Sequence, residues 1–563
     1  MHYLSEQNIF IFLLQIAVLL GAARGLGELF RKWKQPALTA EILVGVFFGP
    51  TILGRFFPSL YQSLFPEDII QQNMLETIAW VGVLFLLLET GLEIDFASAW
   101  RQGMDALKIA IIDIIIPMVI AFIVCYFLPD YYLGNPERRF LFATFMATAM
   151  TISAMPVAVR VLQDLKLSKT DLGFLIMSAL SINDVIGWLI FTLVLGAFTE
   201  TNPGFGRMFA IAGVTILFTI ICFSIGRKLV DEIIIWMKPN RISQPAGVLS
   251  FVCVLAALCG AITQKMGIHA LFGFFIAGIM AGSSKSLSEH VRQIISQMVH
   301  AIFVPLFFVN IGLKIDFFSS FAPLLVMLIT IIGILGRFLG AWVGTSFTTL
   351  PKRSRLIVSI AHIPGGAMEV VVGLLALEYK LITEPIFVAI VFSALISSII
   401  MGPWLSILVK QRKKIRLSKY ISEDNIISHV SHNERDKAIL ELARIIAHKN
   451  KTIDKEKIYK ILINREQEMG TALEDGVAVP HARIQGIRKP IIVFGRSVTG
   501  IEWDAPDGKP VKFIFLILTP EKDYDSQVLI LASIADIMSK TETKEAILCA
   551  KTRHDLTEIF SKV

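Results

Sequence analysis

Most of the chain before Arg416 is a succession of apolar runs, each near the length that a helix needs to cross a bilayer. Such a succession predicts a polytopic α-helical membrane protein, and 18% charged residues are too few for a water-soluble chain of 563 residues. About 13 spans are predicted, at 8–30, 37–54, 74–92, 107–128, 140–162, 172–199, 208–226, 245–264, 268–282, 295–313, 323–347, 356–377 and 385–409.

Charge predicts how the spans are oriented. A basic cluster follows the last span, from Lys410 to Arg416, and basic loops stay in the cytoplasm. With an odd number of spans, the N-terminus is expected outside an inner (plasma) membrane and the C-terminal domain in the cytoplasm. From Leu417 onward Lys and Arg balance Asp and Glu, 22 against 22, so the net charge of +7 belongs to the membrane part. The lipid bilayer explains this excess, and no nucleic acid partner is expected.

Two text matches indicate an internal repeat. LETGLEIDF at 88–96 recurs as VNIGLKIDF at 309–317, and EILVGVFFGPTILG from Glu41 weakly matches HALFGFFIAGIMAG from His269. Both matches are seven spans apart, and an odd offset makes the two copies run in opposite directions through the bilayer. The pattern predicts a 6+1+6 inverted repeat, a transporter design. The alternative is that the motif is a general signal at the end of a span.

Three ionisable residues lie near the middle of predicted spans: Asp184 in the sixth, Arg337 in the eleventh and Glu369 in the twelfth. Such residues are costly in a bilayer and usually face the interior of the helix bundle, where they have a function. Four other acids lie nearer the predicted span ends, where snorkelling explains them better: Glu28, Glu89, Glu93 and Asp113.

Two spans, seven apart, carry backbone breakers beside polar groups. A proline removes a hydrogen-bond donor and a glycine loosens the helix, so both spans are predicted to be broken at membrane depth. The freed carbonyls and hydroxyls are oxygen ligands suited to a small cation. An ordinary proline kink is the alternative for either span. The residues concerned are Thr148, Thr151, Ser153 and Pro156 in the fifth span and Pro364, Gly365 and Gly366 in the twelfth.

The carboxylate of Asp184 supplies a logic for exchange. A desolvated acid holds either a proton or a cation, because its charged and unpartnered form is unfavourable. The neighbouring Asn183 can ligate but cannot titrate, and Arg337 could either balance Asp184 or pair with Glu369. A single titrating carboxylate predicts electroneutral exchange. No cofactor and no resident metal is expected beyond the transported Na⁺ or K⁺ and the proton.

The text at 151–188, TISAMPVAVRVLQDLKLSKTDLGFLIMSALSINDVIGW, closely resembles the core of the monovalent cation:proton antiporter-2 family, which includes Kef-type and plant cation/proton exchangers. The resemblance extends over about 8–409. It implies alternating access, a homodimer, and an ion-binding and proton-carrying role for Asp184. It also implicates Thr151, Ser153 and Pro156 in the site. Many members have Arg-Gly or Gln-Gly where this chain has Gly365 and Gly366, so a polar partner is missing there.

After a basic linker at 411–422, the residues 423–563 alternate between helix and strand signals, with strands PIIVFGRSV and VKFIFLIL and a closing helix from about Ser526. This predicts a cytoplasmic α/β or α+β domain behind the membrane domain at 1–410. The text at 470–490 resembles the phosphotransferase-system enzyme IIA of the nitrogen, mannitol and fructose type. The resemblance implies that His481 accepts a phosphoryl group from a phosphocarrier protein. A second active-site histidine falls on Gln527, and a structural role for His481 is the alternative.

The sequence therefore predicts a secondary active monovalent cation/proton antiporter that serves pH homeostasis, a transporter and not an enzyme. Its C-terminal domain is expected to regulate it in response to a phosphocarrier protein or a small molecule. Two other functions stay open. One is a ligand-gated K⁺ efflux channel, and the other is a membrane-tethered phosphotransferase component.

Overall fold

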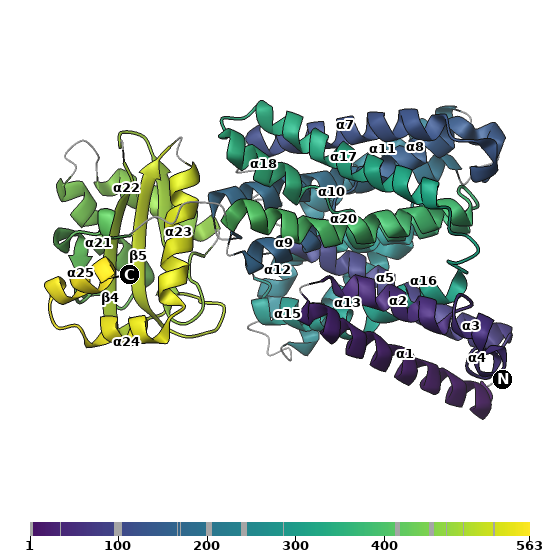
Figure 1. The fold of residues 1–563 in the computed structure, drawn as a ribbon, viewed down its shortest axis with the longest axis horizontal. Coiled ribbons are helices and arrows are strands. Elements are labelled where there is room, and N and C mark those ends of the chain that lie inside the picture. Colours follow the sequence, from purple (N-terminus) through teal and green to yellow (C-terminus); the bar gives the residue numbers. More distant parts are fainter. Residues whose placement is uncertain are drawn as a thin grey trace. The chain divides into compact units, whose positions relative to one another are not determined.

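The computed structural model describes residues 4–33, 35–94, 104–165, 167–168, 170–198, 205–237, 245–284, 286–410, 417–449, 455–468, 470–487, 489–521 and 524–562. These residues form two compact units (Figure 1). The first comprises Met1–Ala158, Met177–Phe347 and Ser359–Trp404. The second comprises Val159–Ile176, Thr348–Val358 and Leu405–Val563. Of the predicted linker, 411–416 lie outside the described residues, as do Asp95 and Phe96 of the first repeat motif.

The first unit is built from helices. They are α1 (Glu6–Lys32), α2 (Ala37–Phe48), α3 (Leu53–Phe56), α4 (Pro58–Leu64), α5 (Ile69–Glu93), α7 (Met104–Tyr126), α8 (Arg139–Ala149), α9 (Met155–Asp164), α10 (Asp171–Phe198), α11 (Phe205–Ile221), α12 (Arg227–Met237), α13 (Ala246–Lys265), α14 (Ala270–Gly282), α15 (Glu289–Met298), α16 (Val304–Lys314), α17 (Pro323–Ser346), α18 (Lys352–Ala361), α19 (Gly366–Glu378) and α20 (Glu384–Lys410). The larger parts of α9 and α18, and one end each of α10 and α20, belong to the second unit. Two π-helical turns join α11 to α12 and α15 to α16: η3 (Cys222–Gly226) and η4 (Val299–Phe303).

Helices occupy all thirteen predicted spans. Among the described residues, ten helical segments are long and apolar enough to cross a membrane, or eleven if the bent pair α18 and α19 counts as one span. Two predicted spans miss this length criterion. The span at 140–162 is divided between α8 and α9, and α14 has only 13 residues. The chain is thus membrane-spanning, and the exact number of spans stays a prediction.

Glycines allow two close helix crossings. α2 packs against α16 and α5 against α14. A Cβ added to Gly45 would lie 2.8 Å from Gly312 Cα, and one added to Gly91 would lie 2.9 Å from Gly278 Cα, so neither crossing tolerates a side chain. Each crossing joins the second span of one predicted half to the third span of the other. A two-fold relation between the halves produces this exchanged pairing, in agreement with the inverted repeat.

The second unit contains an α/β domain, with helices on both faces of a sheet (Figure 1). The sheet order is β1-β4-β5-β2, and β3 also pairs with β5. β4 and β5 are antiparallel and the other pairs are parallel. The strands are β1 (Ile426–Ile427), β2 (Val477–Ala478), β3 (His481–Ile484), β4 (Ile491–Ile501) and β5 (Val511–Pro520), and the helices are α21 (Arg435–Lys449), α22 (Lys455–Glu468), α23 (Tyr524–Met538), α24 (Thr541–Cys549) and α25 (Arg553–Lys562).

Alternation along β5 explains why the sheet is covered on both sides. Ile514 and Leu516 belong to a core with α21 and α22, whereas Phe513 and Phe515 belong to a second core with α23, α24 and α25. Successive side chains of a strand point to opposite faces, so an uninterrupted apolar strand needs two covers. The predicted strands and closing helix are confirmed as β4, β5 and α23.

Candidate functional site

Two helix breaks meet inside the membrane unit. α8 ends at Ala149 and α9 starts at Met155, and α18 ends at Ala361 before α19 starts at Gly366, with a bend of 42°. The breaks are joined by backbone and side-chain bonds. Ala154 N donates to Pro364 O at 2.7 Å, and Ser153 Oγ donates to His362 O at 2.9 Å. The prediction that both spans are broken is confirmed.

The crossing requires glycine at Gly366. Its φ is +56°, in the left-handed region that other residues rarely adopt. A Cβ there would also lie 2.4 Å from Ala154 Cβ on the other break. Pro156 lies in the first turn of α9, where its missing N–H is tolerated because that group would have no partner within the helix.

Asp184 faces the break in the fifth span. One turn before it, Ser181 Oγ lies 3.3 Å from Met155 Sδ, and one turn after it a Cβ added to Gly187 would lie 3.0 Å from Ile152 Cγ1. Residues three apart share one side of a helix, so Asp184 lies between these two contacts. Its side chain is 0% exposed, and neither carboxylate oxygen has a hydrogen-bond partner within the described residues.

The polar groups near Asp184 differ in whether they keep an oxygen that could bind a cation. Thr151 Oγ1 donates to Ala147 O at 2.7 Å, which leaves the hydroxyl oxygen available as an acceptor. Asn183 Nδ2 donates to Asp113 Oδ2 at 3.1 Å, and Asn183 Oδ1 has no partner in the described part of the chain. Ser153, by contrast, is used to join the two breaks.

Arg337 contacts Glu369, the second of the two arrangements that the sequence left open. Arg337 Nη1 lies 3.0 Å from Glu369 Oε2 and donates to Ile152 O at 3.2 Å, with both side chains fully buried. The pair therefore links α17, α19 and the break in the fifth span. A Cβ added to Gly365 would lie 1.4 Å from Glu369 Oε2. The Glu369 carboxylate thus occupies the space that a side chain at Gly365 would need.

The interpretation of Asp113 as a span-end residue is wrong. It is 0% exposed, in the middle of α7, where it accepts the bond from Asn183. The prediction failed because the burial of Asp113 comes from packing against α17, a distant part of the chain. A signal was present: Gly336 and Gly340 on α17 have helical spacing, and a Cβ added to Gly340 would lie 2.9 Å from Asp113 Cα.

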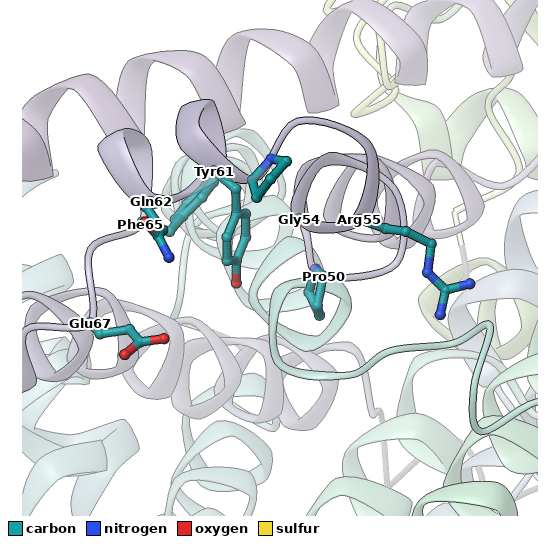
Figure 2. Close-up of a pocket in the computed structure, with 8 residues that line it drawn as sticks. Pro50, Gly54, Arg55, Tyr61, Gln62, Phe65 and Glu67 are labelled. Carbon is teal, nitrogen blue, oxygen red and sulfur yellow. The ribbon is translucent and has the colours of Figure 1, made fainter.

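The other acids assigned to span ends divide into two kinds. Glu28 and Glu93 are exposed, as a span-end position predicts. Glu89 also lies near the end of α5, but it is buried and lies 3.1 Å from His300 Nε2 on the π-helical turn η4, so the explanation by snorkelling is wrong for this residue. A surface pocket elsewhere in the unit includes neither Asp184 nor the residues described around it. It is lined by Pro50, Gly54, Arg55, Pro58, Tyr61, Gln62, Phe65 and Glu67 (Figure 2).

In the second unit, His481 starts β3 and is buried. Its Nδ1 lies 2.7 Å from Val479 O. Because a carbonyl only accepts, Nδ1 carries the proton and Nε2 keeps its lone pair in the neutral ring. Gln527 on α23 is also fully buried, and no described residue hydrogen-bonds its amide atoms.

Comparisons with known proteins agree with this division. Residues 16–411 match the family described as "Sodium/hydrogen exchanger, transmembrane", and residues 419–563 match "Phosphoenolpyruvate-dependent sugar phosphotransferase system, EIIA 2". The chain is 29% identical to the Na⁺/H⁺ antiporter NhaS4 of Synechocystis sp., over 71% of this chain and 97% of that protein. It is 28% identical to cation/H⁺ antiporter 18 of Arabidopsis thaliana, over 72% of this chain and 50% of that protein, so it spans about half of this longer relative.

The fold is also that of a solved antiporter. The structure of the sodium proton antiporter MjNhaP1 from Methanocaldococcus jannaschii matches with a TM-score of 0.55 and 16% identity, over 72% of this chain and 99% of that one. The membrane part thus has a transporter fold, and an enzyme IIA-type domain follows it in the sequence. By the match over 16–411, the chain belongs to the sodium/hydrogen exchanger family.

Proposed function

We propose that the protein is a secondary active antiporter that exchanges one monovalent cation, Na⁺ or K⁺, for one proton at Asp184. The observation that carries this proposal is the difference between Asp184 and three other buried acids of the membrane unit. Glu369 has Arg337, Glu89 has His300 and Asp113 has Asn183, whereas neither oxygen of Asp184 has a hydrogen-bond partner in the described residues.

An acid in this position favours exchange. A buried carboxylate without a fixed partner is unfavourable when it is charged and alone, so it releases a proton only as a cation arrives. The oxygens of Thr151 and Asn183 are free to join it as ligands. Hydroxyl, amide and carboxylate oxygens are hard ligands that suit alkali cations. The two broken spans, joined at Ala154 and Pro364, supply the irregular backbone of such a site.

The pairing of Arg337 supports electroneutral exchange. Since its guanidinium is held by Glu369, Asp184 is left as one carboxylate that takes either one proton or one cation. The choice between Na⁺ and K⁺ stays open, because NhaS4 is named as a Na⁺/H⁺ antiporter whereas a 25% identical relative from Saccharomyces cerevisiae is named as a K⁺/H⁺ antiporter.

Exchange can be measured in inverted membrane vesicles with a pH-sensitive dye, by adding Na⁺ or K⁺ to a preset proton gradient. Asp184→Asn is expected to reduce the cation-driven signal to background. Asp105→Asn, the same change at a partly exposed acid near the start of α7, is the matched control and should keep the signal. An intact signal in Asp184→Asn would refute the site, and cation flux without proton movement would favour a channel.

Three further features belong to the same proposal: location in the inner membrane with the N-terminus outside, a cytoplasmic C-terminal domain that regulates exchange, and a homodimer. Cysteine accessibility at the two termini and crosslinking in native membranes test the first and third of these. A membrane potential that changes the exchange rate several-fold would contradict electroneutrality, since a neutral cycle moves no net charge.

A further inference from the structure

The N-terminal turn of the helix that carries Asp184 lies in the second compact unit, together with the enzyme IIA-type domain. Thr170 starts this turn: its Oγ1 donates to Leu167 O at 2.7 Å and accepts from Gly173 N at 3.0 Å. Asp171 follows as the first residue of α10. Its side chain is only 7% exposed, so its carboxylate must be satisfied within the unit.

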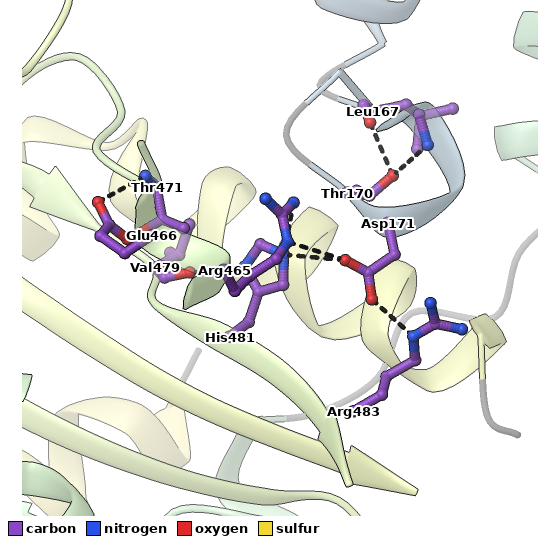
Figure 3. A network of polar contacts seen from close by, with 10 residues as sticks. Leu167, Thr170, Asp171, Arg465, Glu466, Thr471, Val479, His481 and Arg483 are labelled. Carbon is purple, nitrogen blue, oxygen red and sulfur yellow. Dashed lines mark hydrogen bonds and ion pairs between the residues drawn. The ribbon is translucent and has the colours of Figure 1, made fainter. Parts of the chain in front are cut away.

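Three side chains of the enzyme IIA-type domain surround this carboxylate (Figure 3). Arg465 Nε on α22 lies 3.1 Å from Asp171 Oδ1, and Arg483 Nε on β3 lies 2.6 Å from Oδ2. His481 Nε2 lies 3.6 Å from Oδ1. Two guanidinium groups converging on one buried anion form a built anion site, with Asp171 as its occupant and the His481 imidazole beside it.

The histidine is oriented as a nucleophile toward this site. Its Nδ1–H donates to Val479 O, and Arg465 Nη2 lies 3.4 Å from Nε2 and can donate to it. Nε2 therefore has a lone pair that points where Asp171 and Arg465 lie. A phosphorus atom bonded to Nε2, with its three oxygens, would have to occupy the volume that the Asp171 carboxylate now fills.

The hydrogen bonds of its neighbour Glu466 fix the position of Arg465. The next residue, Glu466, is buried and accepts hydrogen bonds from Thr471 N at 2.9 Å, from Trp503 Nε1 at 2.9 Å and from the Thr471 hydroxyl. This satisfied carboxylate holds the end of α22 against the sheet. Arg465 therefore keeps its position whether the anion in the site is the Asp171 carboxylate or a phosphoryl group on His481.

We propose that Asp171 is an internal competitor for the phosphoryl site of His481, and that phosphorylation of His481 displaces it and frees the N-terminal turn of α10. The donor is a phosphohistidine protein or another phosphoramidate. In the transfer, His481 Nε2 forms a bond to phosphorus with its lone pair. The P–N bond of the donor breaks, and its electron pair stays on the donor nitrogen.

Charge decides the competition. A phosphoryl group carries about −1.5 to −2 charges and three acceptor oxygens, whereas a carboxylate carries one charge and two oxygens. Once phosphorylated, His481 brings an anion that the two arginines prefer, and this anion repels Asp171. Asp184 lies about 20 Å farther along α10, so releasing the first turn acts on the helix that carries the exchanging carboxylate.

The phosphorylation step stands by itself, while its consequence for exchange rests on the proposed function. The full-length protein in membrane vesicles is treated with phosphoramidate, and acid-labile phosphate on His481 is measured by mass spectrometry. Asp171→Asn is expected to accelerate labelling by about fivefold or more, because repulsion with the incoming phosphoryl group is removed. Asp164→Asn, an exposed acid of the same segment, is the matched control and should label like the wild type. His481→Gln should not label.

Two further readouts follow the displacement. Amide hydrogen exchange in 171–176 should rise on phosphorylation of the wild type and already be raised in Asp171→Asn. Cation-driven proton exchange should rise about threefold in both cases if an ion-paired first turn restrains α10. Equal labelling of Asp171→Asn and wild type, or no label on either, would overturn the proposal. Normal labelling and hydrogen exchange in a protein without antiport would instead overturn the proposed function and leave the competition at His481 intact.

Discussion

Glu369 and Asp184 are both buried carboxylates of the membrane unit, but they differ in their partners. Glu369 receives a guanidinium at 3.0 Å and lies in the space that Gly365 leaves open, whereas the oxygens of Asp184 have no hydrogen-bond partner within the described residues. The only arginine placed in the middle of a predicted span is thus held by the acid that is not proposed to move ions. The difference separates an acid that joins three helical segments from an acid that no described residue holds by a hydrogen bond.

The largest effect is expected from breaking the paired acid. Glu369→Gln leaves Arg337 as a buried charge without its counterion, which costs about 3–5 kcal/mol. We expect a large fall in the thermal unfolding temperature of the purified protein in detergent. Asp184→Asn should unfold like the wild type, since it removes no fixed partner. Equal destabilisation by the two variants would erase the distinction between the two carboxylates.

A double variant is the control for this prediction. In Arg337→Met with Glu369→Met, both charges are replaced by side chains of similar length, and such replacements are often close to neutral for stability. The double variant should therefore unfold at a higher temperature than Glu369→Gln. If it is no more stable than the single variant, the loss comes from packing at the crossing of α17 and α19 and not from an uncompensated charge.

The next largest effect is expected at the crossing itself. Gly366→Ala places a side chain at a φ of +56°, which costs about 1–2 kcal/mol, and the added Cβ lies 2.4 Å from Ala154 Cβ, which forces a shift. Both stability and exchange should fall. Gly25→Ala on α1 is the control, because nothing lies within 4 Å of the Cβ added there. Unchanged exchange in Gly366→Ala would show that the crossing of the two breaks does not shape the site.

Much of the membrane fold could be predicted from the sequence, because the patterns that indicate it occur many times along the chain. Apolar runs, basic loops and the two copies of G-L-x-I-D-F predicted the spans and the inverted repeat, and prolines and glycines predicted both breaks. The sequence also placed Asp184 and Asn183 in one span. The apolar run VKFIFLIL likewise predicted the strand β5, although it did not indicate that two separate cores cover it.

What the sequence missed are pairings between distant segments. Arg337 could have served Asp184 or Glu369, and only the packing of α17 against the break decides between them. Asp113 was misjudged because its burial depends on the glycines of α17, more than 200 residues away, and not on its own neighbours. Asp171 carried no signal at all, since its partners Arg465, His481 and Arg483 belong to a domain that starts some 250 residues later.

A moderate effect is expected at Asp113. This prediction tests whether exchange at Asp184 depends on the hydrogen bond between Asp113 and Asn183. Asp113→Asn keeps the size but weakens the hydrogen bond that orients the amide of Asn183, and bonds to charged groups contribute about 1.5–3 kcal/mol. We expect roughly tenfold slower cation-driven exchange with the protein still folded. Asp105→Asn on the same helix serves again as the control. Full activity in Asp113→Asn would remove Asn183 from the site.

The smallest effect is expected at Thr151, because one neutral ligand among several is lost. Its hydroxyl donates to Ala147 O, and only its lone pairs are available to a cation. Thr151→Ala should therefore raise the cation concentration needed for half-maximal exchange about threefold, with little change in the maximal rate, since a ligand that acts equally throughout the cycle changes binding alone. Thr148→Ala removes an equivalent hydroxyl, bonded to Thr144 O one turn before the break, and should change neither quantity. If both variants behave alike, the hydroxyl at the break acts only within its own helix. The proposed cation ligands would then be Asp184 and its neighbour Asn183, without a side chain from the broken fifth span.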